Sequence, residues 1–577
     1  MDPDQPIDAS KPESLRPTRW QFFRNLSSCA KSLILLSIAG VALLIIIAVV
    51  AFLYLPRHVP MVLLQQGTYQ GVMMFRSDFN TAVEGFMGIP YAHSPLGELR
   101  FARPRPVFNS NETFKASKYG PSCPGTSLTN SSESDSSSED CLTVNVFRPA
   151  LEINEPLPVG VYFHGGGFSR GAARNHDTAS MVSWAEPFIG VSFNYRLGAL
   201  GFLNSEMMHE QKVLNLGLHD QVMLLDWVQQ NIAAFGGDPE QVTVFGNSAG
   251  AHSIGHHLYN NKTVFHRAIM ESGGPFSRAL HPYNSTLNEK QFQTFMSEVN
   301  CTDIKCLRKA NITNILNASD TVFSRWGPSL RWAWQPVIDG ELVPGRPLEN
   351  TPRNVTILTG FNTNEGSVFV PRNLSTSTEF DNFFNTLLPQ LNRSTLNTTG
   401  ATAPTINETV AEIYPEKEYV EWRKVGKQFR RLEAAYGQYA YSCAVRQNAA
   451  IFDNVYLYHW AVNRTVLGGA SHGDQVSYEV MSNDVRRISS TQRQLARLFH
   501  GYITSFIVHG DPNGGYDDDD RPNWSQVSDR NKTMIIGLGN NERAGGSSKG
   551  VVAQLVHDTW AIDECEYWSV QSRNYED

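Results

Sequence analysis

The sequence predicts an α/β fold in which helices cover both faces of a mostly parallel sheet. Runs of β-branched and aromatic residues recur along the chain with helical stretches between them, at 159–163, 188–194, 242–245, 355–359 and 455–459. One helical stretch carries apolar residues at a helix-like spacing from Leu218 to Ile232. Apolar strands that alternate with helices are typical of a parallel sheet buried on both faces.

An apolar run at 33–55 precedes these elements and contains 23 residues without a charge. As a helix it would reach about 35 Å, enough to cross a hydrocarbon core of about 30 Å. Basic residues gather before the run and only Arg57 follows it closely, which places the N-terminus in the cytoplasm. We therefore expect a disordered cytoplasmic tail at 1–32, a transmembrane signal-anchor helix at 33–55 and a lumenal or extracellular domain at 56–577.

This organisation corresponds to a single-pass type II membrane protein of the secretory pathway. A cleaved signal peptide is the rival interpretation, because Val49-Val50-Ala51 resembles a weak cleavage site. The length of the apolar run and of the tail before it favours an uncleaved anchor.

Charge and cysteine content agree with that location. The net charge of −8 gives no basic surface for nucleic acid. Six of the seven cysteines follow the apolar run and would lie in an oxidising compartment. The same region carries sequons for N-glycosylation, although Asn354 precedes an apolar run and is expected to be buried. The sequons begin at Asn111, Asn130, Asn261, Asn284, Asn300, Asn311, Asn317, Asn354, Asn373, Asn392, Asn397, Asn407, Asn463, Asn523 and Asn531.

A nucleophile motif lies near the middle of the chain. Gly246-Asn247-Ser248-Ala249-Gly250 fits the G-x-S-x-G turn that exposes a reactive serine between a strand and a helix. An apolar run precedes this motif and small, helix-compatible residues follow it. The glycines have a steric reason, because larger side chains beside a strained serine would collide with the strand and the helix.

A glycine-rich block about 80 residues upstream supplies the second half of such a site. His164-Gly165-Gly166-Gly167 follows an apolar run, and its backbone N–H groups are not obstructed by side chains. Donors of this kind stabilise the oxyanion of a tetrahedral intermediate. The two motifs together indicate acyl transfer by a serine nucleophile.

Further blocks occur in one order along the chain: 86–92 (FMGIPYA), 99–101 (LRF), 138–146 (SEDCLTVNV), 163–168 (FHGGGF), 194–202 (NYRLGALGF) and 235–239 (FGGDP). On these blocks the chain resembles the type-B carboxylesterase and cholinesterase family, between residues 66 and 570. The resemblance implies an α/β-hydrolase fold and a serine hydrolase that cleaves carboxylic esters through an acyl-enzyme, without cofactor or metal.

The resemblance also assigns residues to roles. Glu365 lies in a block that matches the family's acid, 364–367 (NEGS), and His472 in one that matches its histidine, 471–474 (SHGD). Asp474 is the alternative partner of the histidine if Glu365 points away. The implied site comprises the nucleophile Ser248, the base His472, the acid Glu365 and the oxyanion-hole amides of Gly166, Gly167 and Ala249.

The family pattern further implies a scaffold around this site. It pairs the lumenal cysteines as Cys123–Cys141, Cys301–Cys306 and Cys443–Cys565, a choice that the sequence alone leaves open among fifteen connectivities. It also implies two structural ion pairs, Arg100–Glu139 and Arg196–Asp220.

Two departures from the pattern bear on specificity. Asn247 replaces the glutamate that usually precedes the nucleophile, and the loop from Cys123 to Cys141 has no tryptophan. The first change removes a carboxylate beside the site, and the second argues against cholinesterase activity. The short polar loop also argues against the apolar lid of a true lipase. We expect a small-molecule ester as the substrate, and the alternative is a weak or inactive adhesion or binding protein on the same fold.

Overall fold

The computed structural model describes residues 27–54, 59–126, 137–277, 280–326, 333–388, 406–421, 424–515, 521–527, 532–557 and 559–575. Residues 1–26 of the predicted tail and the sequons at Asn130, Asn392, Asn397 and Asn531 lie outside these ranges. The chain divides into two units, Met1–His58 and Val59–Asp577.

The first unit contains one described helix, α2, at Ser28–Tyr54. Over the part of the chain that the structure describes, no helix combines the length and hydropathy that crossing a bilayer requires. The membrane-spanning segment expected at 33–55 is therefore not supported by the structure.

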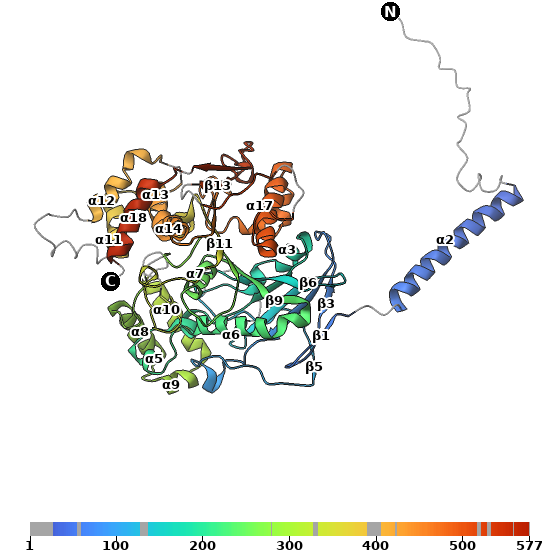
Figure 1. Ribbon diagram of the computed structural model, residues 1–577, viewed down its shortest axis with the longest axis horizontal. Coiled ribbons are helices and arrows are strands. Elements are labelled where there is room, and N and C mark those ends of the chain that lie inside the picture. The colour runs from blue at the N-terminus through green and yellow to red at the C-terminus, as the bar shows by residue number, and fades with distance from the viewer. Residues whose placement is uncertain are drawn as a thin grey trace, which may run out of the picture. The chain divides into compact units, whose positions relative to one another are not determined.

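The second unit is built on a sheet of eleven strands in the order β14-β13-β12-β11-β10-β9-β7-β8-β6-β4-β3 (Figure 1). Its centre, from β8 through β7 to β13, is parallel, and antiparallel strands close both edges. The strands are β3 (Val72–Met74), β4 (Val83–Pro90), β6 (Thr143–Pro149), β7 (Leu157–Phe163), β8 (Ile189–Phe193), β9 (Gly237–Asn247), β10 (Arg267–Glu271), β11 (Thr356–Asn362), β12 (Val455–Trp460), β13 (Lys532–Ile536) and β14 (Ala553–His557). All five predicted runs form strands of this sheet. A small second sheet comprises β1 (Met61–Leu64), β2 (Gly67–Gln70) and β5 (Thr113–Lys115).

Helices connect the parallel strands and cover the sheet (Figure 1). Their bounds are α3 (Thr178–Trp184), α4 (Gly198–Phe202), α5 (Glu206–Glu210), α6 (Leu216–Asn231), α7 (Ala249–His257), α8 (Thr286–Val299), α9 (Ile304–Lys309), α10 (Ile312–Trp326), α11 (Ser377–Leu387), α12 (Ile406–Ile413), α13 (Phe429–Gly437), α14 (Cys443–Ile451), α15 (Val476–Glu479), α16 (Asn483–Arg486), α17 (Ser490–His509) and α18 (Ile562–Tyr575). A π-helical turn, Gln438–Ser442, joins α13 to α14.

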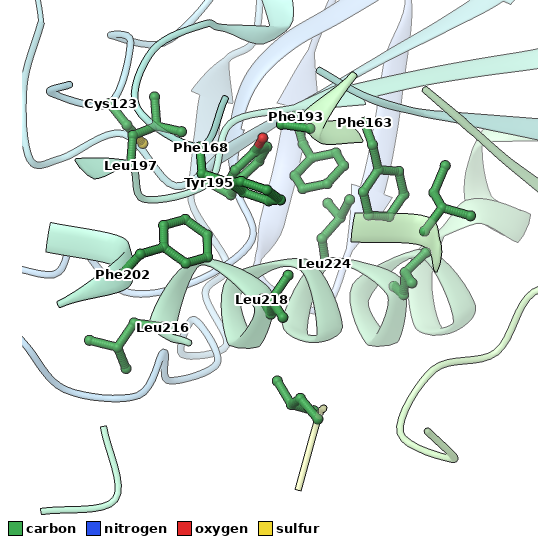
Figure 2. Close-up of a cluster of buried hydrophobic side chains, with 14 of the residues drawn as sticks. Cys123, Phe163, Phe168, Phe193, Tyr195, Leu197, Phe202, Leu216, Leu218 and Leu224 are labelled. Carbon is green, nitrogen blue, oxygen red and sulfur yellow. The ribbon is translucent and has the colours of Figure 1, made fainter. Parts of the chain in front are cut away.

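The two faces of the sheet belong to separate apolar cores, as the alternation of side chains along a buried strand requires. On β7, Val161 and Phe163 lie in the core that contains α6, whereas Tyr162 lies in the core that contains α3 and α17. Figure 2 shows Leu218 and Leu224 of α6 in the same apolar cluster as Phe163 and Phe193. Helices therefore cover both faces, and the predicted α/β architecture is confirmed.

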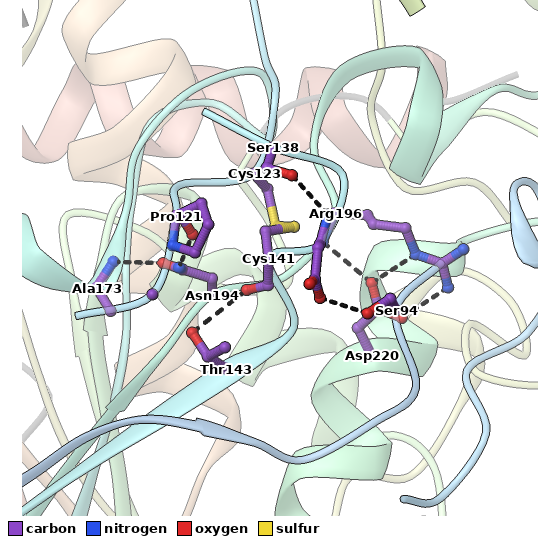
Figure 3. Close-up of a disulfide and its surroundings, with 12 residues drawn as sticks. Ser94, Pro121, Cys123, Ser138, Cys141, Thr143, Ala173, Asn194, Arg196 and Asp220 are labelled. Atoms are coloured by element: carbon purple, nitrogen blue, oxygen red, sulfur yellow. Dashed lines mark hydrogen bonds and ion pairs between the residues drawn. A yellow bond between two sulfur atoms is a disulfide. The ribbon is translucent and has the colours of Figure 1, made fainter. Parts of the chain in front are cut away.

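The scaffold contacts expected from the family pattern are present. Disulfides join Cys123 to Cys141, Cys301 to Cys306 and Cys443 to Cys565. The pairs Arg100–Glu139 and Arg196–Asp220 are each bidentate and buried, with a closest distance of 2.6 Å. Figure 3 shows the first disulfide beside the Arg196–Asp220 pair, and Asn194 fixes the loop nearby by donating to the carbonyl of Pro121.

One expectation about the surface was wrong. Asn354 is exposed, because β11 begins only at Thr356 and the chain before it is still outside the sheet. This sequon is sterically open to glycosylation.

Candidate active site

Ser248 occupies the turn between β9 and α7 with φ 59° and ψ −124°. A positive φ is uncommon for a residue with a Cβ and costs free energy, so neighbouring contacts must hold it. The Ser248 N–H donates to the carbonyl of Glu271 on the adjacent strand β10 at 2.9 Å. The Ser248 carbonyl accepts from His252 N–H in the first turn of α7, also at 2.9 Å.

Both flanking glycines are required, because a side chain at either position would collide with the same backbone atom. A Cβ on Gly246 would lie 2.5 Å from the carbonyl oxygen of Phe163, and a Cβ on Gly250 would lie 2.0 Å from the same oxygen. Both distances are far below a van der Waals contact. The end of β7 therefore packs directly against the turn that carries Ser248, as the steric argument from the motif predicted.

That packing also brings the glycine-rich block next to Ser248. A Cβ on Gly165 would lie 3.1 Å from Ser248 Cβ. The N–H groups of Gly166, Gly167 and Ala249 have no hydrogen-bond partner among the described residues. These donors remain available for an anion that forms beside Ser248.

His164, the first residue of the glycine-rich block, is held by Tyr195 and carries no charge near pH 7. Tyr195 donates its hydroxyl to the His164 carbonyl at 2.8 Å, and the two rings stack with centroids 4.3 Å apart. Burial lowers the pKa of His164 to about 4, so the imidazole is neutral near pH 7.

Glu365 and His472 meet from two further strands of the sheet. Glu365 begins the turn after β11, and His472 lies in the loop after β12. The Nδ1 atom of His472 lies 2.5 Å from Glu365 Oε2. Asn362 donates its N–H to the other carboxylate oxygen at 2.7 Å, which helps to hold the carboxylate in place.

Asp474 was the alternative partner of His472, but its carboxylate bonds to other groups. It accepts the N–H of Ser471 at 2.8 Å and pairs with Arg464 at 3.0 Å. Burial raises the pKa of Asp474 to about 6, and Arg464 opposes that shift. The carboxylate therefore stabilises the loop that carries His472.

The loops that carry Ser248 and His472 lie next to each other, although the structure contains no hydrogen bond between the two side chains. Their loops touch, since a Cβ on Gly473 would lie 3.4 Å from Asn247 Oδ1. The Nε2 atom of His472 is buried and has no hydrogen-bond partner among the described residues. In ligand-free enzymes, hydrogen bonds between catalytic groups are often long and tighten when substrate binds.

Sequence reasoning missed two groups that orient the histidine. The rings of Phe369 and Tyr441 contact the imidazole of His472, with centroids 5.0 and 4.5 Å away. Phe369 lies four residues after Glu365, a spacing that could have suggested the contact. Tyr441 comes from the π-helical turn, which no sequence pattern indicated.

Asn247 shows what the departure from the family pattern does locally. Its amide donates to the carbonyl of Glu271 at 3.3 Å, the same carbonyl that accepts from Ser248 N–H. A carboxylate at this position has no N–H to donate. The asparagine therefore contributes to holding the turn and adds no negative charge beside Ser248.

No group of metal-binding side chains is found among the described residues. The chemistry that the arrangement supports is proton transfer from a serine hydroxyl to an imidazole, beside a set of free backbone donors.

The carboxylesterase family model matches residues 58–554. The chain belongs to the carboxylesterase family. Secreted lipase 4 of Gibberella zeae is 31% identical over 474 residues, which cover 78% of this chain and 83% of the relative. The crystal structure of Aspergillus niger EstA covers 90% of this chain and 99% of its own, with a TM-score of 0.76 and 27% identity. The family and these relatives show an α/β-hydrolase fold and support carboxylic ester hydrolase activity.

One similar protein is described as inactive. A protein of Byssochlamys spectabilis described as the inactive carboxylesterase-like protein VdtD is 31% identical over 373 residues, 58% of this chain and 61% of the relative. Family membership alone therefore does not assign a working triad.

Proposed function

We propose that this protein hydrolyses carboxylic esters through an acyl-enzyme formed on Ser248, with His472 as general base and Glu365 as its partner. The observation that carries the proposal is the 2.5 Å contact between Glu365 and His472 Nδ1, which leaves the buried Nε2 atom free for the serine proton. A carboxylate at Nδ1 selects the tautomer whose Nε2 accepts a proton.

In the first half of the reaction, His472 Nε2 takes the proton of Ser248 as the hydroxyl oxygen attacks the ester carbonyl. The N–H groups of Gly166, Gly167 and Ala249 donate to the oxyanion, and each such donor contributes about 3 kcal/mol to the lowering of the barrier. The protonated imidazole then gives its proton to the leaving alcohol, and Ser248 is left acylated.

In the second half, water attacks the acyl group and His472 accepts its proton. Collapse of the second tetrahedral intermediate releases the carboxylic acid and restores the Ser248 hydroxyl. Glu365 stays ionised throughout and stabilises the imidazolium that forms twice in the cycle.

Hydrolysis of p-nitrophenyl butyrate by the purified chain tests the proposal. We expect turnover that Ser248→Ala abolishes, while Ser253→Ala, at a buried serine of the following helix, retains it. Equal rates in the wild-type protein and in Ser248→Ala would reject Ser248 as the nucleophile.

The alternative is a binding protein on the same fold, and the inactive relative is the observation that favours it. A fluorophosphonate reagent separates the two, because it phosphonylates only a serine whose proton is accepted by a base. An unlabelled, folded protein would favour the binding function.

The membrane anchor rests on the sequence alone, on the uncharged run at 33–55. We propose that this segment retains the hydrolase domain on the lumenal or extracellular side of a membrane. Extraction of the full chain by alkaline carbonate, without detergent, would contradict the anchor.

A further inference from the structure

A cavity of about 420 Å³ lies on the side of the catalytic-acid turn that faces α13 and the segment before α18. Its volume is in the range of small-molecule sites, which is about 300–1,000 Å³. Thr363 and Asn364, which directly precede Glu365, form one part of its wall, and Trp560 and Glu564 form another.

Acidic side chains outnumber basic ones in the wall of this cavity. Glu418, Glu433 and Glu564 line it, against one guanidinium, that of Arg430. Burial raises the pKa of Tyr419, a further lining residue, and the same three carboxylates add to that increase.

Glu433 is the buried member of this set, with only 3% of its surface exposed. Its Oε1 atom accepts from Asn364 at 2.7 Å and from Arg430 at 2.9 Å, and both of these partners also line the cavity. Its Oε2 atom has no hydrogen-bond partner among the described residues. Glu433 is therefore held in the inner wall of the cavity by two residues that line it, and its ionised form acts on a ligand through its charge.

Two aromatic rings accompany the carboxylates. The ring of Trp560 is held in place by stacking on Phe361, with centroids 5.4 Å apart, and it lines the cavity together with Tyr419. Aromatic faces beside carboxylates attract organic cations, since the ring quadrupole and the negative charges act in the same direction.

We propose that this cavity binds a small organic ammonium ion with an aromatic or apolar body. The ammonium group pairs with the carboxylates, and the body of the ligand lies against Tyr419 and Trp560. The inner wall is the turn that carries Glu365, so the ligand would contact the support of the catalytic acid from outside the ester site.

The turn that forms the inner wall of the cavity packs closely against α13. A Cβ on Gly366 would lie 2.0 Å from the carbonyl oxygen of Glu433, so the turn and α13 are in direct backbone contact. Asn364 also receives and donates bonds with Ala470, two residues before His472. The proposed binding site is therefore separate from the ester site. Backbone contacts and hydrogen bonds connect its wall to the segments that carry Glu365 and His472.

Calorimetric titration of the full chain with benzylamine tests the proposal at about pH 8, where this amine is still protonated and the pH lies above the pKa of Glu433, about 7. We expect one site with a Kd of about 1 mM or tighter, and binding of the uncharged isostere benzyl alcohol that is about tenfold weaker or absent. The binding readout does not require ester hydrolysis, so a failure of this proposal can be told apart from a failure of the proposed function.

Variants at the rim locate the site. Glu418→Gln and Glu564→Gln, which keep side-chain size, should each weaken benzylamine binding about two- to fivefold, and the double variant more. Glu112→Gln, at an exposed carboxylate of the chain away from the cavity, should leave Kd unchanged. Prior phosphonylation of Ser248 should also leave it unchanged, because the ester pocket is a different place.

Absence of binding would overturn the proposal. So would a Kd that is the same in the double variant and in the wild-type protein, or binding that is lost when Ser248 is phosphonylated.

Discussion

At the scale of single residues, the main question is which carboxylate is the partner of His472. Glu365 and Asp474 both carry buried carboxylates near His472, but only Glu365 contacts the imidazole, and Asp474 is held by Arg464 and Ser471. The family resemblance predicts Glu365 and leaves Asp474 as the alternative if Glu365 points away. In the structure Glu365, which follows strand β11, points toward the imidazole.

We expect Glu365→Gln to lower kcat for an ester substrate by about a thousandfold to ten-thousandfold with little change in KM, because the amide favours the wrong imidazole tautomer. Asp474→Asn should cause a far smaller loss. Steady-state kinetics of the two variants with one ester decide the assignment, and a larger loss in Asp474→Asn would contradict it.

At the scale of elements, the junction of β7, β9 and α7 fixes the backbone geometry of Ser248. We expect Gly250→Ala to lower the free energy of unfolding by about 3 kcal/mol, because its Cβ would strike a backbone carbonyl that cannot move independently. Gly545→Ala is the control: its φ is also positive, at 86°, but no atom lies within 4 Å of the added Cβ.

For Gly545→Ala only the backbone cost of about 1 kcal/mol remains. Urea unfolding of both variants measures the difference. Equal losses would show that the close approach at Phe163 is not a constraint.

Glu433, on α13, should make the stability of the protein depend on pH. Burial raises the pKa of Glu433 from 4.5 to about 7, against the opposing effect of Arg430. The unfolded chain therefore loses this proton at lower pH than the folded chain, and stability falls as pH rises between these two values. The contribution is about 3 kcal/mol in total.

Glu433→Gln removes this titration. Its stability relative to the wild-type protein should therefore increase between about pH 4.5 and pH 7 and stay level above that range. Chemical unfolding at several pH values measures the difference, and a pH-independent difference would contradict the raised pKa.

Elements were more predictable than the contacts between them. The five apolar runs, and the helix from Leu218 onward, follow from local periodicity and were placed correctly. Tyr441 was not predictable, because it reaches His472 through a π-helical turn that no pattern marks. The cavity beside Glu433 was also not predictable, since its walls come from three segments that are separate in sequence, at 363–364, 418–438 and 560–564.

At the scale of the whole molecule, the disulfides differ in the length of chain that they close. Cys443 and Cys565 are 122 residues apart in sequence, whereas Cys301 and Cys306 are 5 apart. Loop-closure entropy predicts a stabilisation of about 5 kcal/mol for the long loop and about 2 kcal/mol for the short one.

Replacing both cysteines of the long loop by alanine should therefore lower the melting temperature more than the same change in the short loop. Thermal unfolding of the two double variants checks the order. A larger shift for the 301–306 pair would contradict the entropic account.

The central claim is that Ser248, His472 and Glu365 act as one catalytic unit. Peptide mapping by mass spectrometry after treatment with a fluorophosphonate tests it most directly. The account predicts one phosphonylated residue, Ser248, in the wild-type protein and no adduct in folded His472→Ala. An adduct at another serine, or an undiminished adduct at Ser248 in His472→Ala, would contradict it.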